Sequence, residues 1–116
     1  TGKIQSFMDR VFYSAKSAFV HKPAAVISSS RRAGSVTSMD VLNKHLSISE
    51  MPIVTSNYWN EVHGHTPSDV EQDREGLDTM YALGKNMAWM LKCIEAGKKA
   101  GIEIPQNTKR TTNFIR

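Results

Sequence analysis

The chain has 116 residues, and its 15 Lys and Arg against 11 Asp and Glu give a net charge of +4 at pH 7. This length predicts one domain at most. Hydrophobic residues make up 40% and charged residues 22%, which argues against extended disorder. No apolar run approaches the roughly 20 residues that cross a bilayer. The single cysteine, Cys93, excludes an intrachain disulfide and a cysteine-rich metal site. We therefore expect a cytoplasmic protein without a membrane partner.

The first part of the chain predicts a helix followed by a strand. Between residues 3 and 14 the apolar side chains recur at i, i+3, i+4, i+7 and i+8, which is the spacing of one helical stripe; they are Ile4, Phe7, Met8, Val11 and Phe12. After Lys22-Pro23, the continuous apolar run of residues 24–27 is bounded by polar residues. Such a run is typical of a strand that is buried on both faces of a parallel sheet.

The same order is then repeated. A polar loop over residues 31–35 leads into a second helical pattern with Ser35 as its N-cap, and its apolar positions are Val36, Met39, Leu42 and Leu46. Residues 51–55 form another short apolar run and predict a second strand.

A polar and aromatic loop over residues 56–65 precedes the last predicted helix. Thr66 as N-cap, Pro67 at the first position and Asp69 at the third predict the start of a long helix. Gly101 marks its expected end. Gly84 and Ala88 lie on its apolar stripe, so we expect them to pack closely against a sheet.

Alternation of helices and strands predicts an α/β fold with a parallel sheet. Two short strands are too few for a doubly wound sheet, which commonly has about five or six strands. We therefore expect the chain to be the C-terminal half of a larger domain, with residues 1–101 forming the folded part and residues 102–116 a basic tail.

Three segments resemble one family in both order and spacing. Residues 1–10 (TGKIQSFMDR) are similar to a T-G-x-x-K/Q-x-F-x-D-R segment that follows the third strand of flavodoxin-like NAD(P)H-dependent FMN reductases, including their iron–sulfur flavoprotein branch. Residues 22–34 resemble the fourth strand and flavin-facing loop of that family, and residues 83–89 (LGKNMAW) resemble its final helix. The resemblance implies a flavodoxin-like, doubly wound parallel sheet of which this chain supplies the C-terminal half.

The resemblance also implies a site. FMN would lie outside the carboxyl ends of the strands, where we expect the loops at residues 1–2, 28–35 and 56–65 to meet. A Ser/Arg/Gly turn there would offer backbone N–H groups, hydroxyls and a guanidinium to the flavin edge, and the tyrosine–tryptophan pair would cover the ring, from this copy or from a partner. The expected FMN-binding residues are Thr1, Gly2, Ser29, Ser30, Arg31, Arg32, Ala33, Gly34, Tyr58 and Trp59.

Without the resemblance, a solvated turn and an ordinary buried or interface aromatic pair explain the same residues more simply. His63 is expected to contact the substrate or nicotinamide. His63 and His65 have H-x-H spacing, but no further ligands complete a metal site, and we expect none. No side chain forms a catalytic dyad or triad, so none is assigned a catalytic role.

The resemblance favours an FMN-dependent oxidoreductase that takes hydride from NAD(P)H through flavin N5 and passes electrons to a quinone, a nitro compound or another small acceptor. It also implies a homodimer or homotetramer. The alternatives are a flavodoxin-like electron carrier without NAD(P)H turnover and a non-enzymatic α/β fragment that completes its sheet with another chain. A nucleic-acid partner is not expected, because the modest positive charge has no interleaved aromatic residues or groove-reading helix.

Overall fold

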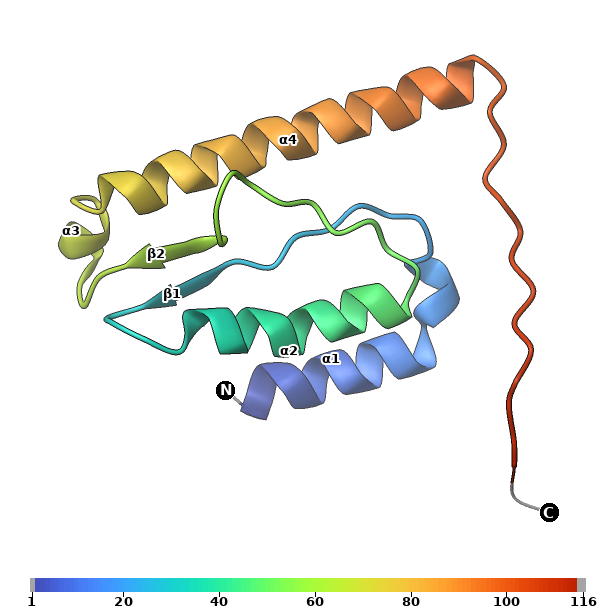
Figure 1. Ribbon diagram of the computed structural model, residues 1–116, viewed down its shortest axis with the longest axis horizontal. Coiled ribbons are helices and arrows are strands. Elements are labelled where there is room, and N and C mark those ends of the chain that lie inside the picture. The colour runs from blue at the N-terminus through green and yellow to red at the C-terminus, as the bar shows by residue number, and fades with distance from the viewer. Residues whose placement is uncertain (1, 115–116) are drawn as a thin grey trace.

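The computed structural model describes residues 2–114, which form a two-stranded parallel sheet with helices on either side (Figure 1). Helix α2 lies against strand β1, helix α4 lies against strand β2, and α1 packs beside α2. The elements in chain order are α1 (Gly2–Ser14), the short 3-10 helix η1 (Lys16–Ala18), β1 (Ser28–Ser30), α2 (Ser35–Ile48), β2 (Glu61–His63), α3 (Pro67–Val70) and α4 (Arg74–Lys99).

The core lies between the sheet and α2. The apolar stripe predicted for the second helix faces it, with Met39 and Leu46 almost fully buried beside Val26. Phe12 packs on this cluster from α1, and Ala24 and Ile53 pack on it from the segments before the two strands. The spacing of apolar residues therefore predicted the inner face of α2 correctly.

The parallel arrangement is confirmed, but the predicted strand positions are wrong. The apolar runs at residues 24–27 and 51–55 share a single parallel bridge, between Ala24 and Ile53. The ladder is formed later, by Ser28–Ser30 against Glu61–His63. Serines take part because the ladder uses backbone groups, which every residue except proline supplies.

A loop interrupts the register between the bridge and the ladder. Three residues separate Ala24 from Ser28, whereas seven separate Ile53 from Glu61. The four extra residues leave the sheet and return at Asn60. Its side-chain Nδ2 donates to the carbonyl of Val26 at 3.1 Å, and its side-chain Oδ1 accepts from the N–H of Ser56 at 3.3 Å. Asn60 therefore holds the loop closed across both strands.

The final helix starts later than the sequence predicts. Thr66 and Asp69 do form a capping box with Pro67 at the first helical position, but this helix, α3, ends at Val70. Asp73 then caps α4, because its carboxylate accepts from the N–H of Gly76 at 3.0 Å. A second cap so soon after the first breaks the expected continuous helix.

Of two further predictions about helix ends, one is wrong and one is confirmed. The N-cap of α2 is Gly34, at φ 93°, and Ser35 is the first helical residue instead of the cap. Gly101 follows the end of α4 at φ 80°, as the sequence predicts for a helix stop.

Only the first part of α4 packs on the sheet. Its buried residues are Gly76, Thr79 and Leu83. The expected close packing of Gly84 and Ala88 is wrong, because both are exposed and a Cβ at Gly84 would meet no atom within 4 Å. The rest of the helix runs past the two-stranded sheet, as Figure 1 shows.

The segment after α4 is extended and exposed as far as residue 114. The carbonyl of Pro105 lies 3.3 Å from His21 Nε2, and the side chain of Asn107 donates to Glu50 at 3.1 Å. The radius of gyration is 17.2 Å, compared with about 13 Å for a compact domain of this length. Among residues 2–114, no helix is long and apolar enough to cross a membrane.

Candidate functional site

The carboxyl ends of the two parallel strands bring several expected site residues together. Ser30 ends β1, His63 ends β2, and these two residues are partners in the ladder. The turn of residues 31–34 follows Ser30 directly and leads into α2. The amino end of α1, where Gly2 lies, points toward this same edge of the sheet (Figure 1). Thr1 lies outside the described residues.

The turn after β1 presents hydrogen-bond donors to solvent. Residues 31–34 are all exposed, and within the described chain their backbone N–H groups donate no hydrogen bond. The hydroxyls of Ser30 and Ser35 lie 2.7 Å apart and hold the two ends of the turn together. Gly34 caps α2 without a side-chain hydrogen bond, so the first N–H groups of that helix also lack a side-chain acceptor. This edge suits a ligand that carries carbonyl oxygens or negative charge.

The aromatic pair lies elsewhere than expected. Tyr58 and Trp59 precede β2, so they lie at its amino end, whereas the sequence predicted that the whole loop of residues 56–65 would follow a strand. Both rings are more than half exposed, and their centroids are 4.9 Å apart. The four extra residues between Ile53 and Glu61 explain the difference, because they place Tyr58 and Trp59 before the ladder.

Tyr58 shares a small cavity of about 210 Å³ with His63. No residue of the turn after β1 lines this cavity, so the structure joins Tyr58 to His63 but not to the Ser/Arg/Gly turn. Its remaining lining residues come from β2 and the start of α4, namely Glu61, Asp73, Glu75, Gly76 and Thr79.

Asp73 organises this cavity, and the sequence analysis did not single it out. Its carboxylate accepts from the N–H of His63 at 2.6 Å and from that of Gly76 at 3.0 Å. The His63 ring lies 3.9 Å from Asp73 Oδ2 and 4.0 Å from Glu61 Oε2. Asp is a residue type preferred at N-caps, and its place directly before a helical pattern is the signal that could have identified Asp73.

Two carboxyl groups at the starts of α3 and α4 have lowered pKa values. The N–H of Gly76, and then that of His63, hold the pKa of Asp73 below its ordinary value of 3.8. The N–H and hydroxyl of Thr66, followed by the N–H of His65, lower the pKa of Asp69 in the same direction. Both groups therefore bind a proton more weakly in the folded chain than in the unfolded chain.

We expect stability to fall in acid for this reason. The contribution of Asp69 and Asp73 is fully present above the unfolded-state pKa of 3.8 and is lost as the pH falls through their lower folded-state values. Urea unfolding measured from about pH 7 down to about pH 3 tests this. The double variant D69N/D73N is expected to show a shallower loss of stability, and an unchanged slope would contradict the assignment.

The described residues 2–114 contain no group of three or more His, Cys, Asp or Glu placed to hold a metal ion.

More than half of the chain matches a model of a known protein family. The model for NADPH-dependent FMN reductases matches residues 1–66. The chain belongs to the NADPH-dependent FMN reductase family. The match covers α1, β1, α2 and β2, and so it includes the turn after β1 and the aromatic pair. No curated protein and no solved structure matches the chain significantly.

Membership of the FMN reductase family implies a flavodoxin-like fold, of which the described chain shows a parallel α/β part. The turn after β1 fits one part of FMN, the carbonyl- and nitrogen-bearing edge of the flavin ring. That edge requires N–H donors, and residues 31–34 expose donors that the rest of the described chain leaves unused. A Cβ at Gly34 would meet no atom within 4 Å, so the backbone there is open to close approach by a ligand.

Proposed function

We propose that the chain forms part of a cytoplasmic NAD(P)H-dependent oxidoreductase that holds FMN at the carboxyl edge of β1 and β2. The acceptor would be a quinone, a nitro compound or another small molecule. Family membership supports the cofactor and the reaction class. The observation that carries the placement is the exposed turn of residues 31–34, with its unused N–H donors and the start of α2, which has no side-chain cap.

When bound, FMN supplies the chemistry of accepting hydride and passing electrons on. The turn of this chain would bind and orient the ring through the N–H groups of residues 31–34 and the hydroxyl of Ser29. The guanidinium groups of Arg31 and Arg32 would stabilise negative charge at the pyrimidine side of the ring. Ser30 would act indirectly, because its hydroxyl contacts Ser35 and fixes the shape of the turn.

Tyr58, Trp59 and His63 would complete the site on the substrate side. The cavity of Tyr58 and His63 does not include the turn, so we propose that the aromatic pair covers the flavin of a partner copy. His63 would contact the nicotinamide or the acceptor, with its backbone position fixed by the hydrogen bond to Asp73.

Binding of FMN tests the proposal directly. The protein is prepared as the 116-residue chain and also with any sequence that precedes Thr1 in its gene, and quenching of FMN fluorescence is titrated. We expect R31A/R32A to weaken FMN binding by about tenfold, because two charge-assisted contacts are lost. The matched control R10A/R74A removes the same charge from exposed positions on α1 and α4 and is expected to bind normally.

Absence of FMN binding in both preparations would overturn the proposal. Bound FMN without oxidation of NADPH or NADH, tested with an artificial acceptor, would instead identify an electron carrier. The two-stranded sheet specifically favours the remaining alternative, in which the chain completes its sheet with another polypeptide. A purified complex of this chain with another polypeptide, of fixed stoichiometry and without FMN binding, would establish that alternative.

We also propose that the protein is a homodimer or homotetramer in which α4 takes part. The second half of α4 and residues 102–105 line an apolar groove of about 620 Å³, and Trp89 in it is 66% exposed. A groove of this kind is expected to be covered in the assembled protein.

The mass in solution tests this assembly. We expect light scattering after gel filtration to give at least twice the 13.0 kDa of one chain, and W89E to shift the protein toward the monomer by placing a charge in the contact. Y81E is the matched control, because Tyr81 is also an exposed aromatic on α4 but does not line the groove. A monomeric wild-type protein would contradict the proposal.

A further inference from the structure

Another hollow lies between α1 and α2, away from the turn after β1 where we propose that FMN binds. It has a volume of about 460 Å³, which is within the usual range for small-molecule sites. Residues of both helices line it near their carboxyl ends, together with Lys109 from the C-terminal tail. Because α2 has 14 residues, its two ends are about 20 Å apart. The hollow is therefore separate from the turn that begins α2.

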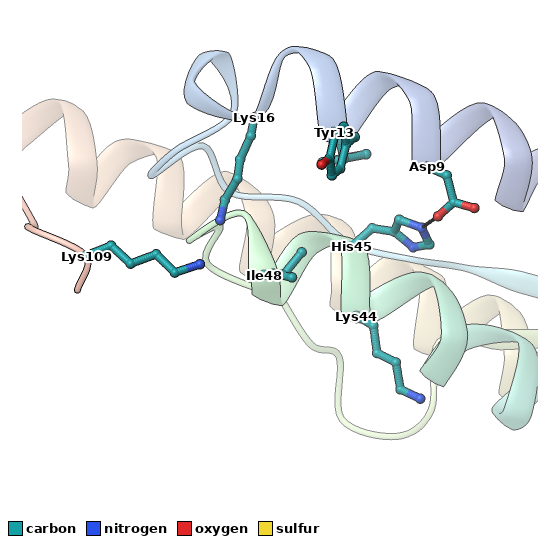
Figure 2. A pocket seen from close by; sticks show the side chains of 8 residues that line it. Asp9, Tyr13, Lys16, Lys44, His45, Ile48 and Lys109 are labelled. Atoms are coloured by element: carbon teal, nitrogen blue, oxygen red, sulfur yellow. Dashed lines mark hydrogen bonds and ion pairs between the residues drawn. The ribbon is translucent and has the colours of Figure 1, made fainter. Parts of the chain in front are cut away.

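The lysine side chains in this hollow lack acidic partners among the described residues. Figure 2 shows the ammonium groups of Lys16 and Lys109 extending toward the same region beside Ile48, while that of Lys44 points away. In the part of the chain that the structure describes, neither Lys16 nor Lys109 forms a salt bridge. Two cations directed into one hollow leave a local positive charge that an anion would neutralise.

The nearby carboxylates contact groups other than Lys16 and Lys109. Asp9 is the one acidic residue that lines the hollow, and its Oδ1 lies 2.8 Å from His45 Nε2 (Figure 2). Glu50 lines a neighbouring hollow with Lys16, but it accepts a hydrogen bond from Asn107. The other ring nitrogen of His45 is buried and has no hydrogen-bond partner within residues 2–114. The lining therefore leaves both cations and one polar atom unused.

The rest of the hollow is apolar and includes aromatic rings. Tyr13 is 95% exposed and Ile48 is 66% exposed, so both offer surface to a ligand. Phe12 also lines the hollow, and its ring stacks on that of Phe19 with centroids 4.6 Å apart. A flat apolar group placed against Tyr13 would gain stacking and would cover side chains that are otherwise in water.

We propose that this hollow binds a small organic anion that joins one phosphate or carboxylate group to a flat apolar body. The anionic group lies between Lys16 and Lys109, and the apolar body lies against Tyr13 and Ile48. The site is distinct from the proposed FMN site in position and in residues, so its occupancy does not depend on the turn after β1.

Calorimetric titration with 2-naphthyl phosphate tests this site. We expect a dissociation constant below about 1 mM, and much weaker binding of inorganic phosphate and of neutral 2-naphthol, because each carries half of the recognised chemistry. K16Q/K109Q is expected to weaken binding by about tenfold, since two partly screened ion pairs are lost. The control K3Q/K85Q removes the same charge from exposed positions outside the hollow and is expected to change it less than about twofold.

Further variants test whether the ligand binds in this hollow independently of the proposed FMN site. Y13A is expected to weaken the naphthyl ligand but not inorganic phosphate, and R31A/R32A is expected to leave both unchanged. Circular dichroism confirms that each variant is folded. Equal affinity for 2-naphthol, or no response to K16Q/K109Q, would overturn the proposal. Binding to phosphatidylglycerol vesicles through the same lysines, without binding of 2-naphthyl phosphate, would also overturn it in favour of a membrane surface.

Discussion

Replacing Gly76 with alanine is expected to lower the free energy of unfolding by about 2 kcal/mol. A Cβ at this position would lie 2.9 Å from Val62 Cγ1 and closer still to the Asp73 carboxylate. Gly76 is buried in the first turn of α4, where the helix meets β2, so the added methyl group displaces the Asp73 carboxylate from its N–H donors and crowds the Val62 side chain. Urea unfolding followed by circular dichroism measures the change.

Gly84 on the same helix provides the matched control. It is exposed, and a Cβ there would meet nothing within 4 Å, so G84A is expected to raise stability by about 0.5–1 kcal/mol through helix propensity alone. The two substitutions make the same chemical change with opposite expected signs. If both raised stability equally, the close contact between α4 and β2 at Gly76 would be wrong.

The second large effect is expected at Asp73. D73A removes the acceptor for two backbone N–H groups, one in β2 at His63 and one in α4 at Gly76. Loss of a helix cap alone costs about 1 kcal/mol, and leaving the half-buried His63 N–H without its acceptor adds a further cost of about 1 kcal/mol or more. We expect a total loss of about 2–3 kcal/mol in the free energy of unfolding.

Asp69 separates these two contributions. It also accepts backbone N–H groups at a helix start, from His65 and Thr66, but it belongs to the four-residue helix α3 and is exposed. D69A is therefore expected to lower the free energy of unfolding clearly less than D73A does. An equal cost for both variants would contradict the role of Asp73 in joining β2 to α4. D73N, which retains one acceptor oxygen, is expected to recover part of the loss.

The sequence predicted most of the helical structure and little of the sheet geometry. The stripe through Met39 and Leu46 identified the buried face of α2, because apolar side chains that recur with a 3.6-residue period lie on one side of a helix. The strands were displaced because the bridge and the ladder depend on backbone pairing between segments far apart in the sequence, and the side chains of Ser28–Ser30 carry no strand pattern. The same limitation concealed the loop that Asn60 closes.

The candidate site was predictable in part. The position of the turn after β1 followed from the order of elements, since loops at the carboxyl ends of parallel strands share one edge. The separation of Tyr58 from that turn did not, because it depends on the four extra residues before Glu61. Asp73 was missed because its role is to accept two backbone N–H groups, and one of these comes from a strand ten residues earlier.

The loop of residues 54–60 leaves the sheet at one fixed point and returns at another. Its length is therefore not set by the pairing of the strands on either side. Insertions or deletions here would change how far the aromatic rings reach while the ladder and His63 stay in place. In evolutionary terms, residues 55–59 can change in length and sequence while Val54 stays buried and Asn60 keeps its hydrogen bond to Val26.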